Sequence, residues 1–435
     1  MDPMVDADTT VGQSKAHIEP SIAEQIIPRP SALFSEWLLR PDIVHLDHGS
    51  SGACPRSVFD AQTALRLEIE RGSPDFFLRR YHALLSASKA ALARFLHADP
   101  ANLALMPGTT HAMNAVLQSQ KFQAGDELLT TSHAYASTFT LLKAMAERDG
   151  AVVTTAQIPL VPTSPHEVLE IVLSCVTDKT RFAVIDHIPS RTALVYPIAA
   201  IVQALEARGV DVCVDGAHAP GQIALNLSDL NVPYYIASCH KWMCAPRGVG
   251  FLYVRSDKLE CVKPVIVART TYNKDAYEGE HTKLQHRFDW FGTFDPSAYC
   301  VLPKVVDWLE GLVPGGNEAR MKANHELAVQ AAEVVFRAVG IGRGETKRWV
   351  PEGMMPCMVV VPLPDSKGLV NKGVLDIQKD LWERFAVEVQ VYSFPRWPAR
   401  TLRFSCQAHN CLEQYVYLGE CLKILLEEED NKFVR

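Results

Sequence analysis

The sequence lacks the long hydrophobic runs that membrane-spanning helices require. No stretch of about 18 uncharged apolar residues occurs in the chain, so we expect no membrane span. The first segment, MDPMVDADTTVGQSKAH, is acidic and polar, without the basic and apolar regions of a secretory signal. We therefore interpret residues 1–20 as a mobile leader and expect a cytoplasmic protein.

Basic patches are also missing. The 435-residue chain has a formal net charge of −7, a pI near 6.1 and no run of lysine or arginine. Nucleic-acid-binding proteins carry the opposite pattern, so this class is excluded. With 48% hydrophobic residues, the chain is long enough for a substantial core and is expected to form two domains.

The eleven cysteines show no disulfide framework, because they are scattered singly. Cys175, Cys213 and Cys421 lie in apolar segments and are interpreted as small buried hydrophobes of a reducing compartment. Two pairs lie near a histidine, namely Cys239 with Cys244 and Cys406 with Cys411. A zinc site has a tighter ligand pattern, so we predict no metal and keep a zinc hydrolase only as an alternative.

No internal repeat or low-complexity segment interrupts the chain, and its middle alternates strand and helix signals. Strands are predicted at 126–132, 151–158, 181–187 and 210–216, and helices at 81–97, 137–148, 166–176 and 197–209. The strands FAVID and VDVCVD are apolar nearly throughout instead of alternating. This pattern predicts a parallel sheet covered by helices on both faces, an α/β fold.

The pattern changes from about Ser297 onward. Long helices are predicted at 298–312 and 318–339, strands at 357–363, 387–393 and 401–407, with a helix before the second strand and another at the end. These elements indicate a smaller α+β domain.

Polar residues follow several of the predicted parallel strands. His187 comes after RFAVID, Asp215 and His218 come after VDVCV, and Gly108-Thr109-Thr110 precedes the helix HAMNAVLQS. Ligands of such sheets bind beyond the carboxyl ends of the strands, so we expect these residues to converge on one crevice.

The sequence offers an anion site, a carboxylate and an unusual amine. Gly108, Thr109 and Thr110 begin a helix whose free N–H groups and dipole favour an anion, although threonine is also a routine helix cap. Asp215 is either a turn residue or a carboxylate facing a protonated ring nitrogen. Lys241 lies among apolar and glycine residues in SCHKWMCAPRGVGFLYV, where desolvation would make it a good amine nucleophile.

An imine-forming lysine, an aspartate for a pyridinium nitrogen and an anion-binding helix terminus together predict a pyridoxal phosphate site. The chain resembles the class V group of fold-type-I pyridoxal phosphate enzymes, in the branch of isopenicillin N epimerase-like proteins and ergothioneine C–S lyases. It is also similar to the fungal loline-pathway cyclase. The resemblance runs from HLDHGSSGACP through PGTTHAMNAVLQS, VDGAHAPG and ASCHKWMCAPRGVGFLYV to RFSCQAHN.

The resemblance implies a large cofactor-binding domain over 45–296 with a mainly parallel seven-stranded sheet, and a small α+β domain over 21–44 and 297–435. It also implies a homodimer in which Thr293 reaches the neighbouring subunit's phosphate. The implied catalytic residues are Lys241, Tyr135 and Asp215. The other implied cofactor-binding residues are Gly108, Thr109, Thr110, His187, His218, Ser238, His240 and Thr293, and the implied substrate-binding residues are Arg403, His48 and Ser50.

Three of these residues have a plain structural alternative. Arg403 is alternatively a strand-edge arginine in an ion pair, Tyr135 a packing residue, and His187 a hydrogen-bonded residue at a strand end. The chain also departs from the family pattern at Asp47, Pro189, Arg191 and Phe294, which are positions that shape the substrate pocket.

The resemblance implies an enzyme that acts on an α-amino acid through an external aldimine and a Cα carbanion. A lyase or epimerase outcome in specialised, fungal-type metabolism is favoured. The alternatives are a Mannich-type cyclase of alkaloid biosynthesis, a conventional aminotransferase, and a catalytically inactive interaction protein. The presence of both Lys241 and Asp215 speaks against the last.

Overall fold

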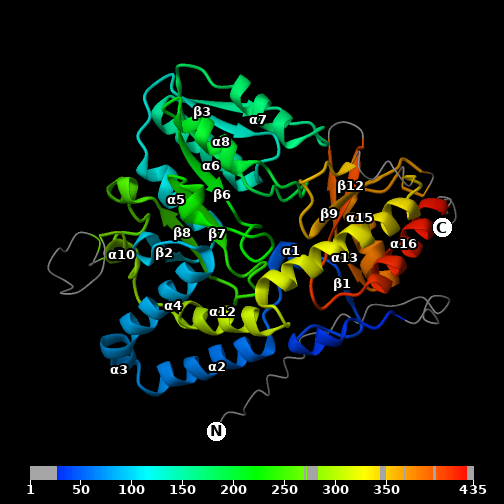
Figure 1. The fold of residues 1–435 in the computed structure, drawn as a ribbon, viewed down its shortest axis with the longest axis horizontal. Coiled ribbons are helices and arrows are strands. Elements are labelled where there is room, and N and C mark those ends of the chain that lie inside the picture. Colours follow the sequence, from blue (N-terminus) through cyan, green and yellow to red (C-terminus); the bar gives the residue numbers. More distant parts are fainter. Residues whose placement is uncertain are drawn as a thin grey trace, which may run out of the picture.

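The fold is described from a computed structural model, which covers residues 27–268, 271, 283–342, 349–366, 368–369, 371–394 and 398–428 (Figure 1). The predicted leader over residues 1–20 lies outside the described residues. No helix within these ranges is long and apolar enough to cross a membrane.

A seven-stranded sheet forms the centre of the larger unit, with strand order β2-β8-β7-β6-β5-β3-β4. Only β8 runs antiparallel to its neighbours, so the predicted α/β fold with a mainly parallel sheet is confirmed. The strands are β2 (Leu103–Met106), β3 (Glu127–Thr131), β4 (Val152–Ala156), β5 (Thr180–Asp186), β6 (Asp211–Asp215), β7 (Tyr234–Ser238) and β8 (Gly250–Val254).

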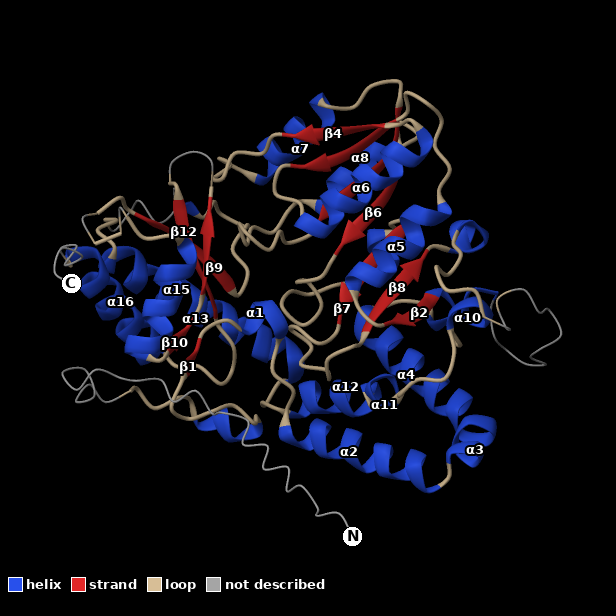
Figure 2. Ribbon diagram, turned by 180° about the vertical axis from the view of Figure 1, so that it is seen from behind, coloured by secondary structure: helices blue, strands red, loops and turns tan. Residues whose placement is uncertain are grey.

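Helices cover both faces of this sheet, which explains why its central strands are apolar on both sides (Figure 2). One face packs against α5 (Thr109–Ser119), α6 (Ala136–Asp149) and α10 (Lys283–Phe288). The other face packs against α4 (Tyr81–Leu96), α7 (Pro165–Ser174), α8 (Ile198–Glu206), α11 (Ser297–Cys300) and α12 (Leu302–Gly311). The short helices α1 (His48–Ser51), α3 (Ser73–Asp75) and α9 (Leu227–Leu230) and the longer α2 (Arg56–Arg71) complete this unit.

A second core belongs to the smaller unit, where three strands and three helices pack together. Its sheet has the order β11-β12-β9, formed by β9 (Met358–Leu363), β11 (Gln390–Ser393) and β12 (Arg400–Ser405). The helices are α13 (Gly316–Ala338), α15 (Val374–Phe385) and α16 (Leu412–Glu427). The short strands β1 (Val44–His45) and β10 (Val387–Glu388) pair with each other, so the N-terminal region joins this unit.

Two predicted elements are divided in the structure. The helix predicted at 298–312 is interrupted at Val301, and Pro303 follows in the first turn of α12, where its missing N–H is tolerated. The strand predicted at 387–393 is divided at Val389, because β10 pairs with β1 while β11 pairs with β12. Both predictions of a single element were therefore wrong.

The two hydrophobic cores draw on different parts of the chain. Trp37 and the helices α11 and α12 belong to the core around the large sheet, because α11 and α12 pack on α2 and α4. The second core begins with Ala328 of α13 and includes Val44 and Leu46. The predicted domain boundaries at 44/45 and 296/297 stay a prediction.

Close packing of α13 against α16 generates a test of the smaller core. A Cβ atom on Gly419 would lie 3.0 Å from Cβ of Ala338. We expect Gly419→Val to push the helices apart and lower the free energy of unfolding by about 1–3 kcal/mol. Chemical denaturation measures this, with Val416→Ala as the control because Val416 is 44% exposed on the same helix. Equal stability of the two variants would contradict the prediction.

Candidate functional site

The loop that carries Lys241 joins two antiparallel strands, β7 and β8. The two strands and this loop thus form a hairpin. Within the loop, Cys239 N donates to Val249 O at 3.0 Å and Ala245 N donates to Cys239 O at 3.1 Å. These bonds hold the two ends of the loop together and fix the backbone position from which the Lys241 side chain projects.

Two glycines let the rest of the chain approach this loop closely. Gly52 has φ +65°, and a Cβ there would lie 1.9 Å from the carbonyl oxygen of His240. Gly221 has φ +82°, and a Cβ there would lie 2.6 Å from the carbonyl oxygen of Trp242. Both positions require glycine for conformation and for space, so the lysine loop is clamped between two backbone turns.

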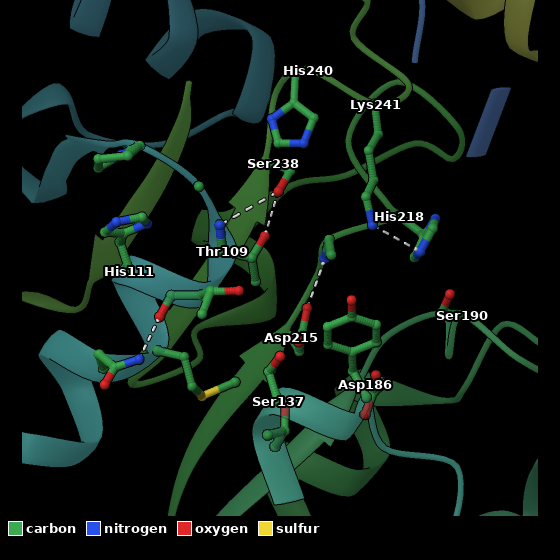
Figure 3. Close-up of a pocket in the computed structure, with 18 of the residues that line it drawn as sticks. Thr109, His111, Ser137, Asp186, Ser190, Asp215, His218, Ser238, His240 and Lys241 are labelled. Atoms are coloured by element: carbon green, nitrogen blue, oxygen red, sulfur yellow. Dashed lines mark hydrogen bonds between the residues drawn. The ribbon is translucent and has the colours of Figure 1, made fainter. Parts of the chain in front are cut away.

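The side chain of Lys241 enters a cavity of about 330 Å³ at the carboxyl ends of the strands. Figure 3 shows Thr109, Ser238 and His240 on one side of it, His218 and Ser190 on the other, and Asp215 between them. The predicted site residues that line the cavity are Ser50, Gly108, Thr109, Thr110, Tyr135, Asp215, His218, Ser238, His240 and Lys241.

The amine of Lys241 is buried and chemically activated. Its Nζ donates to Nε2 of His218 at 3.1 Å. Burial lowers the pKa of Lys241 to about 8, although the negative charges of Asp215 and Asp186 oppose that shift. Burial also lowers the pKa of His218 well below its ordinary value, which suits a neutral acceptor. A substantial fraction of Lys241 is therefore a neutral, nucleophilic amine near pH 8.

One end of the cavity is built for an anion. Thr109 begins α5, whose first-turn N–H groups have no partner within the helix. The hydroxyls of Thr109 and Ser238 share a hydrogen bond of 2.6 Å, and His240 is bonded through Nδ1 to Val249 O at 3.2 Å. Helix N–H groups and hydroxyls at one point are the donors that a phosphate requires.

The other end is acidic. Asp215 is the last residue of β6, and Ala217 N donates to its Oδ1 at 3.0 Å. Burial raises the pKa of Asp215 above its ordinary value, while the Ala217 bond and the Lys241 charge oppose that rise. A carboxylate held this way is suited to a cationic N–H donor.

Tyr135 lies just before α6, lines the cavity and is 49% exposed. Its ring is therefore not fixed by packing against the protein core. Its predicted place over a cofactor ring stays a prediction.

Four predicted residues do not line the cavity, namely His187, Thr293, Arg403 and His48. His187 is buried and its Nδ1 is 2.9 Å from the Tyr235 hydroxyl, so it stands as a hydrogen-bonded residue at a strand end. Thr293 is exposed in the segment between α10 and α11. Neither contributes to the lining of the cavity within this chain.

Arg403 lies fully buried behind the cavity wall. Its Nη1 donates to the carbonyl and hydroxyl oxygens of Ser190 at 2.8 and 2.9 Å, and its Nη2 donates to Asp47 at 2.9 Å and to Ser50 at 2.5 Å. Its planar fork is thus engaged with an internal carboxylate and with two serines that line the cavity.

His48 supports the lysine loop from behind. Its Nε2 donates to the carbonyl oxygen of Lys241 at 3.1 Å, and burial lowers its pKa to about 3. The ring is neutral at physiological pH and does not line the cavity.

The cavity also contains polar residues that the sequence prediction missed. They are His111, Asn114, Ser137, Thr138, Asp186 and Ser190. Asp186 had a readable signal, because it ends the predicted strand RFAVID one residue before His187. No sequence signal pointed to Ser190, because it meets Arg403 only in the folded chain.

The cysteine pairs considered for zinc are placed as follows. Cys239, Cys244 and Cys406 are buried, while Cys411 is partly buried. Within the described part of the chain, no group of three or more histidine, cysteine or acidic side chains could hold a metal ion.

The residues present fit pyridoxal phosphate. The cavity combines an anion-binding helix terminus, an activated amine and a buried acidic end, and the cofactor carries a phosphate, an aldehyde and a basic ring nitrogen. The buried carboxyl oxygen Asp186 Oδ2 and the ring nitrogen His218 Nδ1 have no hydrogen-bond partner among the described residues. Buried polar atoms of this kind normally have a partner, which a polar ring would supply.

The chain is similar to known enzymes over most of its length. Residues 47–342 match the family model "Aminotransferase class-V". Isopenicillin N epimerase of Streptomyces clavuligerus is 32% identical over 90% of this chain and 97% of its own length. A probable chloroplastic L-cysteine desulfhydrase of Arabidopsis thaliana is 27% identical over 89% of this chain and 84% of its own length.

A solved structure of the cystine C–S lyase C-DES in complex with its reaction product, cysteine persulfide, has the same fold. It superposes with a TM-score of 0.75 at 22% identity, covering 89% of this chain and 98% of that one. The matched family, the long relatives and the shared fold agree with the fold, enzyme class and cofactor predicted from the sequence. The chain therefore belongs to the class-V aminotransferase family of pyridoxal phosphate enzymes.

Proposed function

We propose that this protein abstracts the Cα proton of an α-amino acid, with Lys241 as the cofactor-binding amine and proton-transferring base. The observation that carries the proposal is the buried Lys241 amine, whose pKa is lowered to about 8 between an anion-binding helix terminus and a buried carboxylate. Pyridoxal phosphate, when bound, supplies an electron sink that makes the Cα–H bond of an attached amino acid acidic.

The chain's own groups divide the remaining work. Thr109, Thr110 and Ser238 would bind the phosphate, with the α5 N–H groups adding donors. Asp215 would hold a proton at the ring nitrogen, which keeps the electron sink strong. Lys241, once displaced by the substrate amine, remains within the cavity, where a base must lie to move a proton at Cα.

Several outcomes can follow removal of the Cα proton. Expulsion of a β-sulfur group gives a lyase, and return of the proton to the other face gives an epimerase. The names of the relatives, an epimerase and a cysteine desulfhydrase, support these two outcomes. A Mannich-type ring closure in fungal alkaloid metabolism and transamination are the other fates, and product analysis distinguishes all four. Any turnover would contradict the alternative that the chain is a catalytically inactive interaction protein.

The proposal includes a cytoplasmic homodimer in which Thr293 reaches the partner's phosphate. The exposure of Thr293 is compatible with such a contact. Val265, Ile266 and Val267 form a cluster of exposed apolar residues beside a groove that α5 and α10 help to line. Exposed apolar clusters often mark protein interfaces, so this cluster supports the proposal that a second subunit covers it.

The central prediction concerns hydrogen exchange at Cα. Wild-type protein loaded with cofactor should incorporate deuterium at Cα of its amino-acid substrate in D2O, measured by mass spectrometry over a panel of amino acids. Lys241→Ala should lose this exchange by about 10²–10⁴-fold, because it lacks the base. Lys143→Ala, which removes an exposed lysine of α6, is the control. Full deuterium exchange in Lys241→Ala would show that Lys241 is not the base that removes the Cα proton.

A second prediction concerns pH. Only the neutral amine of Lys241 could add to the aldehyde that pyridoxal phosphate would bring, and the pKa of this amine is about 8. The rate at which cofactor-free protein captures pyridoxal phosphate should therefore rise with pH and level off above about 8, as followed by visible absorbance. An ordinary lysine amine, with a pKa of about 10.4, serves as the control in a model peptide. If the midpoint of the pH dependence lay near that of the peptide, the claim that the pKa of Lys241 is lowered would be contradicted.

A third prediction separates the two roles open to Arg403. Arg403→Met alone leaves the carboxylate of Asp47 without its ion pair and should destabilise the fold by about 3–5 kcal/mol. Arg403→Met combined with Asp47→Asn removes both charges and should recover most of that stability. If Arg403 binds the substrate carboxylate, the double variant should still bind cofactor while the KM for the amino acid rises about tenfold or more. An unchanged KM would leave Arg403 with a structural role only.

A further inference from the structure

A second acidic residue lies beside Asp215 at the acidic end of the cavity. Asp186 is the last residue of β5 and pairs in register with Asp215, the last residue of β6. The two residues are 3% and 5% exposed, and both line the cavity. Figure 3 shows Asp186 and Asp215 on neighbouring strands below Lys241 in the view. The sheet register thus places two carboxyl groups side by side facing the same space.

The carboxyl group of Asp186 is only partly satisfied by the protein. The backbone N–H of Tyr135 interacts with it, but Oδ2 has no hydrogen-bond partner among the described residues. Leaving a buried carboxyl oxygen without a donor is costly, so such an atom usually has a hydrogen-bond partner in protein, water or ligand. Because Asp186 lines the cavity, that partner would come from the cavity.

The charged neighbours of Asp186 indicate what kind of partner it takes. Asp215 repels a second negative charge, and together with burial it raises the pKa of Asp186 well above its ordinary value. Lys241 is the cation that favours ionisation of both carboxyl groups, while Tyr196 is a further titratable neighbour. Two adjacent buried carboxyl groups with one nearby amine are complemented by a ligand that brings a second positive charge.

We propose that Asp186 is a further cofactor-binding residue, whose Oδ2 joins Asp215 in holding the protonated ring nitrogen end of pyridoxal phosphate. The inference rests on the proposed function of the same site. Under this inference, two carboxyl groups instead of one form the acidic end of the cavity. The pair offers the ring nitrogen more negative charge than a lone aspartate does, and the unsatisfied Oδ2 acquires a cationic neighbour.

The alternative is that Asp186 serves only as an acceptor for the Tyr135 backbone at the start of α6. Asp186→Asn separates the two roles, because the asparagine amide keeps an oxygen acceptor but carries no negative charge. A merely structural role predicts no change in the charge state of the bound cofactor. A role in holding the cofactor ring predicts that the charge state of the bound cofactor changes.

The experiment titrates the full-length chain, freed of cofactor, with pyridoxal phosphate and follows the visible absorbance. Asp186→Asn should raise the dissociation constant about tenfold or more, because a contact to a charged group is lost. It should also lower the pH at which the band of the bound cofactor titrates, since removing a negative charge lowers the pKa of a neighbouring cation. Asp178→Asn, in the exposed turn just before β5, is the matched control and should match wild type.

Each outcome decides one of the two proposals. If wild-type protein binds no cofactor, the proposed function is wrong. If wild type binds and Asp186→Asn matches it in affinity and in the titration of the band, only the role of Asp186 is wrong. If wild type binds, Asp215→Asn should weaken cofactor binding whether or not Asp186 takes part.

A second measurement applies if Asp186→Asn does not fold. Infrared difference spectra of protein with ¹³C-labelled aspartate carboxyl groups, recorded on cofactor addition, should show two responding buried carboxyl groups in wild type. One should remain in Asp215→Asn. A wild-type response that disappears entirely in Asp215→Asn would overturn the inference.

Discussion

The structure depends on keeping one amine out of water. Lys241 is held in a closed loop between β7 and β8, and its burial lowers its pKa while two buried carboxyl groups prevent a larger fall. An exposed lysine would be fully charged at neutral pH and a poor nucleophile. The positive-φ turns at Gly52 and Gly221 and the bond from His48 to the Lys241 carbonyl all hold this loop in place.

The parallel sheet supplies the rest of the site by its topology. The carboxyl ends of β5, β6 and β7 present Asp186, Asp215 and Ser238 in spatial order across neighbouring strands. The start of α5 adds an anion-binding terminus beside Ser238. The cavity is therefore graded from donors for an anion, through an amine, to acidic groups, and under the proposed function this gradient would orient the cofactor.

The smaller unit contributes the region where substrates would be distinguished. Arg403 comes from β12 of that unit and reaches Ser190 and Asp47 of the segments around the large sheet. Its charge is balanced by Asp47. A substrate carboxylate at this point would compete with an internal carboxylate, which ties the choice of substrate to the contact between the two cores.

Most helices and strands, the mainly parallel sheet and the key chemical groups could be predicted from the sequence alone. Buried apolar strands, helix-start signals and an amine among apolar residues are local properties, so Lys241, Asp215 and the 108–110 turn were readable from it. Tertiary structure alone decided that Asp186 joins Asp215, that His187 turns to Tyr235 and that Arg403 pairs with Asp47. These contacts join residues from separate elements, and strand register and side-chain packing, which no local pattern encodes, bring them together.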